Sequence, residues 1–360
     1  HEVKKETATQ YKILKNLMHD TRVESVVCAT DAGREGELIF RLVYEQAGCR
    51  KPMKRLWISS MEESAIRDGF ENLKPGSDYD SLYQSALCRQ QADWLVGLNG
   101  TRLFTVLYGG KVLKVGRVQT PTLAMLVDRE VKIMNFEKEQ YYMAHILMDG
   151  IDAMTERIDD KARAESIAAA CESQSGVVRS VIKENKSVAP PKLYDLTTLQ
   201  RDANRIFGFT AKQTLEYTQS LYEKKLVTYP RTDARVLSTA VAKEIHKNIR
   251  GLSGFANVQS YAAEVLEGTA WKKIASTRYV NDKQITDHYA IIPTGQGLSA
   301  LRSVSDLSVK VYELIVRRFL SIFYPPAIYQ KTTLVSKVQQ ESFFSSFRLL
   351  LSEGYLKVAG

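Results

Sequence analysis

Two periods in the spacing of apolar residues predict the elements of the first part of the chain. Residues 7–19 place apolar side chains at helical spacing, and VESVVCAT (23–30) is a β-branched run typical of a buried strand. The polar string DAGREGE follows and leads into ELIFRLVYEQ, which predicts a helix. KRLWISS (54–60) and a helix from Glu62 repeat this order weakly. The pattern predicts a parallel α/β unit, in which ligand-binding residues gather at the carboxyl ends of strands.

The middle of the chain changes from a helical to a strand-like pattern. From Ser81 to about Glu139 the spacing is helical, with Thr120 as a predicted N-cap and Pro121 at the first helical position. Residues 140–192 alternate in YYMAHILMDG and GVVRSVIKEN, which indicates strands, and end in the linker-like SVAPPKL. We therefore expect a boundary near Pro190-Pro191.

The last part of the chain predicts helices enclosed by strands. Helices are expected at 197–207 and 210–225, followed by a short strand LVTYPR. Residues 311–324 are again helical in pattern, and IYQKTTLVSKV with ESFFSSFRLLL predicts a pair of strands that resembles the strand-rich stretch before residue 192. The segment 193–304 is thus interpreted as an insertion within one β-rich domain.

The composition limits the class of protein but does not indicate a particular function. A chain of 360 residues with 44% hydrophobic content is long enough for two or more domains. Its net charge of +9 is spread along the chain and favours a polyanionic partner only weakly. The four cysteines are widely separated, which indicates neither a zinc ribbon nor a disulfide framework. No apolar run approaches a membrane span of ~18 residues, so we expect a cytoplasmic protein.

The strongest chemical signal is TYPRTDAR, residues 228–235. Pro230 restricts Tyr229 to an extended backbone, so that Tyr229 and Arg231 project on the same face. A tyrosine that attacks a phosphodiester must lose a proton from a phenol of pKa ~10, and an adjacent guanidinium favours that loss and matches the geometry of a phosphate. Thr228 and Asp233, in the same string, are candidate DNA contacts.

An isolated string of this kind is more often ordinary structure, with the tyrosine in a strand and the arginine on the surface. Two further polar residues are candidates to act together with this string: Glu223 at the end of the preceding helix, and His288 within TDHYAIIPT. A lone histidine is itself more often structural than catalytic. The interpretation of Tyr229 as a nucleophile therefore depends on these residues being brought together.

A second cluster is acidic. Asp31, Glu35 and Glu37 lie in ATDAGREGE, between the end of a buried strand and the start of a helix. Carboxylates there could hold Mg²⁺, which prefers oxygen ligands and bridges to phosphates. The alternative is that the acids merely favour the helix N-terminus while the glycines make the turn.

A third set consists of candidate phosphate contacts. In VGRVQTPTLAMLVDRE (115–130), Arg117 and Gln119 lie just ahead of a predicted helix whose N-terminal amides could face a phosphate. In RQQADWLVGLNGTR (89–102), Arg89, Asp93 and Arg102 are candidates, whereas Trp94 and Leu98 are expected to pack in a core. The alternative for both is a capped helix with a solvated surface.

Six segments resemble, in order, the signature segments of type IA DNA topoisomerases: TDAGREGELIF, RLWISS, QADWLVGLNGTR, VGRVQTPTLAMLVDRE, the stretch LYDLTTLQ to TYPRTDAR, and TDHYAIIPT. The match covers about residues 20–355. RLWISS and TYPRTD resemble the bacterial topoisomerase III kind. Six segments in the right order are far more specific than any one of them.

The resemblance implies a toroidal core of mixed α/β and α+β domains. The implied parts are a toprim α/β domain at 1–58, the first part of a helical DNA-gripping domain at 59–138, a β-rich arch at 139–192 and 305–360, and an inserted helical domain with the catalytic tyrosine at 193–304. Tyr229 would form a transient 5′-phosphotyrosine bond without ATP, and Arg231 would orient the scissile phosphate. His288 would lie near DNA phosphates, and Gln219 and Glu223 would line the cleavage site.

The sequence departs from the family pattern in two respects. Many relatives have D-x-D-x-E, whereas Gly33 stands here in place of the second acid, which leaves Asp31 and Glu35, with Glu37 as a supplement, for Mg²⁺. The first toprim strand and the regions after Gly360 are also expected to be missing, so that the chain is truncated at both ends.

The resemblance further implies particular partners and leaves two rival functions. Single-stranded or underwound DNA is the expected partner, with a helicase as a further one, in a monomer associated with the bacterial nucleoid. One rival is a nucleic-acid-binding fragment without catalysis. The other is a toprim nuclease or primase in which Asp31 and Glu35 do the chemistry and Tyr229 is structural.

Overall fold

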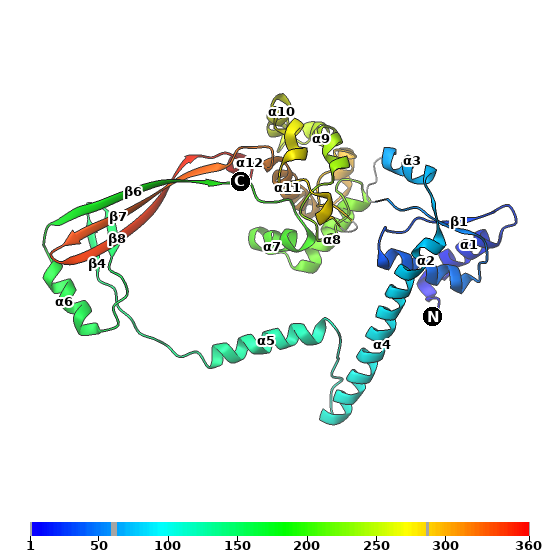
Figure 1. Cartoon of the computed structure of the whole chain (residues 1–360), viewed down its shortest axis with the longest axis horizontal. Helices are drawn as coiled ribbons and strands as arrows, with labels where there is room; N and C mark the ends of the chain where they lie inside the picture. The colour runs from blue at the N-terminus through cyan, green and yellow to red at the C-terminus, as the bar shows by residue number, and fades with distance from the viewer. Residues whose placement is uncertain (1, 59–62, 286–287, 360) are drawn as a thin grey trace. The chain divides into compact units, whose positions relative to one another are not determined.

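The computed structural model describes residues 2–58, 63–285 and 288–359 (Figure 1). The chain forms two compact units. Among the described residues, the first unit comprises the chain up to Phe136 together with His288, and the second comprises Glu137–Ile285 and the chain from Tyr289 onward. No helix among the described residues has the length and apolar character needed to cross a membrane.

The first unit begins with a small α/β layer, as the sequence predicts. Strands β1 and β2 are parallel, β2 and β3 are antiparallel, and α2 connects the parallel pair. Met18, Ala47 and Cys49 form a small core against Val26 and Tyr44. The elements are α1 (Ala8–His19), β1 (Val26–Cys28), α2 (Arg34–Ala47), β2 (Met53–Arg55), α3 (Glu63–Glu71) and β3 (Lys74–Pro75), with short 3₁₀ turns η1 (Lys5–Thr7) and η2 (Gly76–Tyr79).

Two long helices, α4 (Asp80–Tyr108) and α5 (Gln119–Met134), complete the first unit. The start of α4 packs on α2 through the buried side chains of Tyr83 and Ala86. Beyond this contact the helix is largely exposed, and Trp94 has 64% of its surface accessible, so the expectation that it packs in a core is wrong. The spacing of apolar residues predicts which face of a helix is apolar, but it does not show whether another element packs against that face.

The loop between α4 and α5 returns along α4. The Leu113 and Val115 amides donate to the hydroxyls of Thr105 and Thr101, each at 3.0 Å. Helix α5 begins at Gln119, two residues before the expected Pro121, and its N-cap is Val118, so the prediction of Thr120 as the N-cap is wrong. Thr120 still ties the turn, since its hydroxyl accepts from the Gly116 amide at 3.1 Å.

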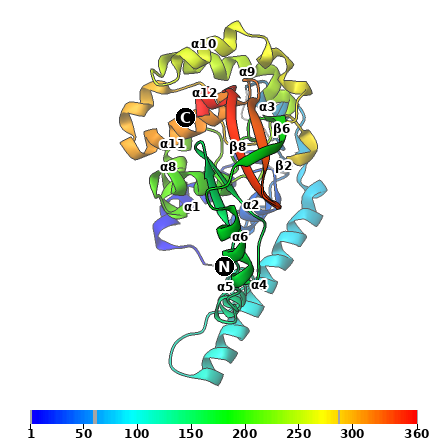
Figure 2. The same ribbon diagram turned by 90° about the vertical axis from the view of Figure 1, so that its left-hand side faces the viewer.

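The second unit contains an antiparallel sheet in the order β4-β5-β8-β7-β6 (Figures 1 and 2). Strands β6, β7 and β8 are long and lie side by side, as the alternating patterns predict. Helix α6 (Lys161–Cys171) packs at one end of the sheet, where Ile167 and Phe343 share a small core. The strands are β4 (His145–Met148), β5 (Ile151–Met154), β6 (Gly176–Val188), β7 (Ala327–Val338) and β8 (Glu341–Ser352).

The rest of the second unit is helical and contains the largest core of the described chain. Side-chain capping boxes start α7 at Asp195 and α8 at Thr210, close to the predicted positions. The elements are α7 (Leu196–Phe207), α8 (Ala211–Glu223), α9 (Thr239–Gly251), α10 (Gln259–Glu267), α11 (Asp306–Ser321) and α12 (Leu356–Ala359), with 3₁₀ turns η3 (Leu252–Gly254), η4 (Ala270–Ser276), η5 (Asp282–Gln284) and η6 (Leu298–Ser303).

The structure corrects where α11 belongs. We expected residues from 305 onward to continue the β-rich domain, but Tyr312, Ile315 and Phe319 of α11 are fully buried in the helical core with α7 and α8. The apolar stripe of α11 could be predicted from the sequence, but the elements that pack against it could not. The helical part therefore extends past the predicted boundary at residue 304.

The proline-containing linker is tied to this core as well. The Pro190 carbonyl accepts hydrogen bonds from the Tyr279 hydroxyl at 2.8 Å and from the Arg278 guanidinium, and the Lys192 carbonyl accepts from Arg318 at 3.2 Å. The linker at Pro190-Pro191 thus leaves β6 and is fixed to the helical part by three side chains.

Candidate functional site

Apart from His288, which is grouped with the first unit, the candidate residues around Tyr229 lie in the second unit and the others in the first. The first group lies at the loop between β1 and α2, which contains Asp31, and at the first turn of α2, which contains Glu35. Gly36 packs so closely on this loop that a Cβ atom there would lie 2.2 Å from the Asp31 carbonyl oxygen. The Thr30 hydroxyl donates to the Gly36 carbonyl at 2.7 Å and ties the loop to the first turn of α2. Gly36 is therefore required for the close approach of helix and loop.

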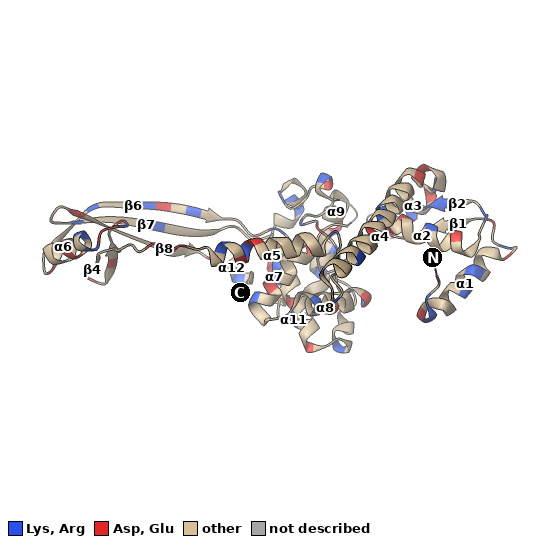
Figure 3. Cartoon of the chain, turned by 90° about the horizontal axis from the view of Figure 1, so that it is seen from below, with Lys and Arg blue, Asp and Glu red and all other residues tan. Residues whose placement is uncertain are grey.

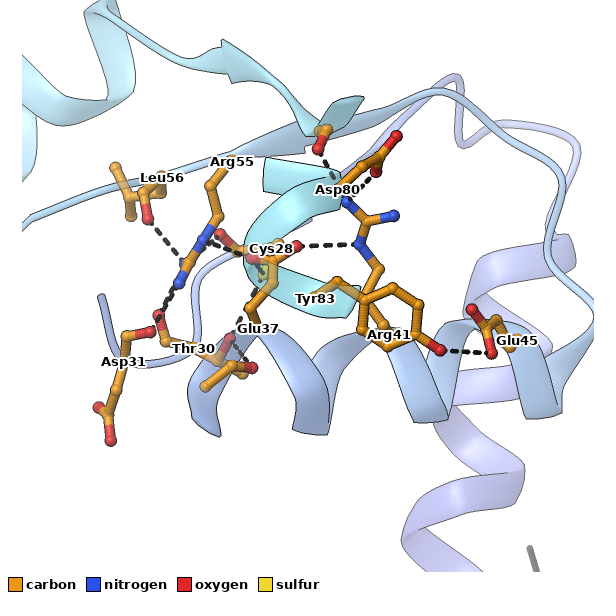
Figure 4. A network of polar contacts seen from close by, with 12 residues as sticks. Cys28, Thr30, Asp31, Glu37, Arg41, Glu45, Arg55, Leu56, Asp80 and Tyr83 are labelled. Carbon is orange, nitrogen blue, oxygen red and sulfur yellow. Dashed lines mark hydrogen bonds and ion pairs between the residues drawn. The ribbon is translucent and has the colours of Figure 1, made fainter. Parts of the chain in front are cut away.

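Arg55, the last residue of β2, lies beneath the same loop. Its side chain is fully buried and donates to the carbonyl oxygens of Thr30 at 2.7 Å and of Asp31 at 2.6 Å (Figure 4). The Asp31 carboxylate points away from the guanidinium, whereas its backbone carbonyl faces it. Asp31 is an exposed residue, so its carboxylate is accessible to a ligand.

Glu37 does not take the role expected of it. Its side chain is fully buried, with Oε1 2.9 Å from the Nε atom of Arg41 and Oε2 3.0 Å from that of Arg55. Both carboxylate oxygens are thus engaged by arginines, and the expectation that Glu37 supplements a metal site is corrected. The reason is its place one turn into α2, where the side chain turns toward the core rather than toward the loop.

Glu35 is 62% exposed and forms an ion pair with Arg89 of α4, and it lies 3.6 Å from Arg34. The structure therefore brings together a candidate metal ligand and a candidate DNA contact. One exposed carboxylate on the loop and one on the first turn of α2 fit Mg²⁺, which commonly takes one or two protein carboxylates and keeps several waters. In the described ranges no three His, Cys, Asp or Glu side chains gather as a larger metal centre would need.

The remaining candidates of the first unit lie on α4 and α5. Arg117 and Asp93 form an ion pair in which the Arg117 Nε atom donates to both carboxylate oxygens, at 2.9 Å and 3.1 Å. Gln119 begins α5 and is exposed, and Arg102 is exposed on α4. Figure 3 shows lysine and arginine spread over many elements rather than gathered on one of them.

The second group surrounds Tyr229 and rests on two extended segments that run side by side. Residues 226–228 pair with 290–294 through hydrogen bonds from the Thr228 amide to Ile292 at 3.0 Å and from the Thr294 amide to Leu226 at 3.0 Å. A bridge between Val227 and Pro293 belongs to the same pairing. The string TYPR therefore lies beside the AIIPT part of the segment that follows His288.

Thr228 acts in this pairing rather than at the surface. Its hydroxyl donates to the Ala290 carbonyl at 3.0 Å and accepts from the Ile292 amide at 2.9 Å. These bonds take up the donor and one acceptor site of the hydroxyl. The structure thus gives Thr228 a role in fixing the backbone next to Tyr229 that the sequence did not predict.

Tyr229 is half-buried and meets the ring of Tyr222 edge-on, with ring centroids 5.3 Å apart. The flanking residues alternate, since Pro230 and Thr232 are buried whereas Arg231 and Asp233 are exposed. An alternation of period two is typical of an extended segment and supports the expectation that Tyr229 and Arg231 share a side. His288 is half-buried, at the start of the neighbouring segment.

The end of α8 adds Gln219 and Glu223. The Gln219 side-chain amide donates to the Glu223 carboxylate at 3.0 Å, as residues four apart on a helix allow. Tyr222, which contacts Tyr229, precedes Glu223 in the sequence, so the end of α8 lies beside Tyr229. Sequence reasoning missed Tyr222 and Arg55, although both stand within the quoted motifs, because each acts through a contact with a distant segment.

Comparison with known proteins identifies the family of the chain. A family model described as DNA topoisomerase matches residues 77–360, and the chain belongs to this family. Within it, the chain is 41% identical to DNA topoisomerase 3 of Bacillus licheniformis and 40% identical to that of Bacillus subtilis, over 98% of its own length. These alignments cover 49% of each relative, so the chain spans about half the length of the curated relatives it matches.

A solved structure shows the same fold. Full-length topoisomerase I from Thermotoga maritima matches 99% of this chain and 58% of its own, with a TM-score of 0.71 and 25% sequence identity. The similarity therefore covers both units of the chain.

Proposed function

We propose that this chain is the DNA-cleaving core of a type IA DNA topoisomerase that needs no ATP. It cuts one strand through a 5′-phosphotyrosine bond to Tyr229, lets another strand pass and reseals the break. Relaxation of negatively supercoiled DNA and decatenation are the resulting activities. The observation that carries the proposal is the pairing of the Tyr229 segment with residues 290–294, which fixes the backbone next to a half-buried tyrosine beside α8.

The chemistry follows from the phenol and its neighbours. The Tyr229 oxygen loses its proton and forms a bond to phosphorus, while the bond from phosphorus to the 3′ oxygen breaks and that oxygen gains a proton. One phosphodiester replaces another, so the reverse attack by the 3′ hydroxyl reseals the strand without an external energy source. Arg231 is exposed on the same extended segment and suits the charge of the phosphate.

Other residues support these steps. Glu223, held by Gln219 at the end of α8, is a carboxyl group that can hold the proton exchanged with the leaving oxygen. His288, Asp233 and Gln119 are proposed to contact the bound strand. Asp31 and Glu35 would hold Mg²⁺, which when bound supplies positive charge to neighbouring phosphates. Arg89, Arg102 and the Arg117–Asp93 pair are proposed phosphate contacts of α4 and its connection to α5.

The test is a covalent adduct. A single-stranded oligonucleotide labelled at its 3′ end is incubated with the chain, with and without Mg²⁺, and denatured, and the label is then followed onto the protein. A 5′-phosphotyrosine bond leaves the 3′-labelled fragment on the protein, whereas a 5′-labelled oligonucleotide gives only a shortened free strand. Tyr229→Phe should abolish the adduct.

The matched control is Tyr222→Phe, which keeps the neighbouring ring and removes a different hydroxyl. It should form the adduct at nearly the wild-type level. Cleavage that survives in Tyr229→Phe without an adduct would instead support a toprim nuclease acting through Asp31 and Glu35. Binding of the oligonucleotide with neither cleavage nor adduct would support the fragment that binds without catalysis.

A further inference from the structure

Arg55 has an environment that ordinary burial does not explain. It is the last residue of β2, its side chain is fully inaccessible, and it is surrounded by backbone carbonyls. Its Nη1 atom donates to Cys28 at 3.1 Å, to Thr30 at 2.7 Å and to Leu56 at 2.9 Å, and its Nη2 atom donates to Asp31 at 2.6 Å (Figure 4). Three of the four acceptors belong to the end of β1 and the loop that carries Asp31.

The charge of this arginine is compensated in place. The Nε atom lies 3.0 Å from Glu37 Oε2 without the alignment of a hydrogen bond, so Glu37 acts here mainly through its charge. The Trp57 ring lies 4.9 Å from the Arg55 guanidinium carbon and stacks on Tyr79, which closes the other side of the cation. A buried cation without such partners would be strongly destabilising. The pattern R-L-W in the sequence thus includes the cation and one of the rings that cover it.

We propose that Arg55 is a positioning residue for Asp31, and through Asp31 for the divalent cation site of the proposed function. The guanidinium fixes the carbonyl before and the carbonyl after the Asp31 Cα atom, and Gly36 packs closely on the Asp31 backbone. The direction of the exposed Asp31 carboxylate is therefore set from the interior. Glu37, rather than ligating the metal, compensates the buried charge of Arg55 and holds the side chain in place. The inference rests on the proposed function for its metal and on the contacts of Arg55 for its mechanism.

Lysine cannot replace Arg55 in this role, although it keeps the charge. Arginine presents five N–H donors in a planar fork, whereas lysine presents one ammonium group from a single point. An ammonium near Glu37 would satisfy the ion pair and lose contact with the Asp31 carbonyl. Arg55→Lys therefore keeps the positive charge at this position and removes the hydrogen bonds that fix the loop.

The chain also provides a matched control. Arg41 is nearly buried, contacts the other oxygen of Glu37 at 2.9 Å, and bonds to Gly76 and Asp80, each at 2.8 Å. None of these contacts involves the loop that carries Asp31. Arg41→Lys should disturb the same carboxylate without releasing that loop.

The experiment measures Mn²⁺ binding to the 360-residue chain by electron paramagnetic resonance, and amide hydrogen exchange of peptides covering residues 29–36 in the absence of metal. Arg55→Lys should weaken Mn²⁺ binding about tenfold or more, as the loss of a partner behind a metal ligand commonly does, and should speed exchange in the loop. Arg41→Lys should leave both readouts within about twofold of wild type, and Asp31→Asn should abolish the binding.

The outcomes separate the inference from the proposed function. Wild-type Mn²⁺ binding and loop exchange in Arg55→Lys would overturn the inference and leave the proposed site intact. Binding that is unchanged in Asp31→Asn, or absent from wild type, would remove the metal from the proposed function and the inference with it. If Arg55→Lys does not fold, the neutral pair Arg55→Gln with Glu37→Gln is used, and the same loss of binding and of protection is expected.

Discussion

At the scale of single residues, two buried tyrosines of the helical core differ in one respect that can be measured. Tyr312 is fully buried, burial raises the pKa of its phenol, and its hydroxyl has no hydrogen-bond partner among the residues that the structure describes. Tyr194 is buried to a similar degree, but its hydroxyl donates to Asp202 at 3.0 Å. Asp202 is also held by Arg318 at 2.7 Å.

Removing each hydroxyl should therefore have opposite effects. Tyr312→Phe removes an unsatisfied polar group and should leave stability unchanged or raise it by about 1 kcal/mol, because the cost of burying that group disappears. Tyr194→Phe should lower stability by about 1–2 kcal/mol, since it leaves a charged pair short of one hydrogen bond. Denaturant unfolding followed by far-ultraviolet circular dichroism measures both. Equal destabilisation by the two variants would show that the Tyr312 hydroxyl has a partner.

At the scale of elements, patterns within one segment were predictable and partners across segments were not. The alternation in β7 and β8 and the capping residues Asp195 and Thr210 are local signals, and the structure has these elements close to where they were expected. The role of the Thr228 hydroxyl in the backbone pairing was not predicted because its acceptor, Ala290, lies 62 positions away in the sequence.

The acidic residues of the loop after β1 and of the first turn of α2 show the same limit of prediction from local sequence. Asp31 and Glu35 are exposed as a ligand site requires, whereas Glu37, two residues further on, is buried against Arg41 and Arg55. Helical geometry alone would have suggested different directions for these side chains. What the sequence does not show is the position of Arg55 on a neighbouring strand, which gives the buried Glu37 its second partner.

The contact between α10 and the end of the chain gives a prediction that depends on pH. Glu264 accepts hydrogen bonds from Lys357 of α12 at 2.8 Å and from the Tyr324 hydroxyl at 2.9 Å, which hold the pKa of its carboxyl below the usual value. A carboxyl group with a lowered pKa in the folded state stabilises the fold above the unfolded value of ~4.3, and this contribution is lost as the pH falls through the lower folded value.

Glu264→Gln should thus lower the free energy of unfolding at pH 7 by at most about 1 kcal/mol, because the pair is half-exposed and screened by solvent. The difference from wild type should shrink as the pH falls below ~4.3. Thermal unfolding at a series of pH values measures this, with Glu267→Gln on the same helix as the control. A difference that is constant across that range would show that the ion pair is not its source.

At the scale of the whole molecule, the surface of α4 and α5 is unusual for a protein that is stable by itself. Large apolar side chains are exposed along both helices, including Val106 at 81%, Met125 at 72% and Leu126 at 64%. Soluble monomers rarely expose continuous apolar patches beyond a few hundred Å². The family resemblance implies a monomer, whereas this exposed apolar surface favours association.

We expect the 360-residue chain to associate through these helices as its concentration rises and to bind a hydrophobic dye. Replacing Val106 and Met125 together by lysine should weaken both effects, because it places charge on the exposed apolar face of each helix. Gln91→Lys, at an exposed polar position of α4, adds charge without removing apolar surface and should change neither.

Light scattering coupled to size exclusion measures the association, and dye fluorescence measures the exposed surface. A chain that stays monomeric at every concentration and binds no dye would show that α4 and α5 cover their apolar residues in solution. Association that persists in the double lysine variant would instead place the contact on another surface, such as β6, whose Val177, Val181 and Ile182 are also exposed.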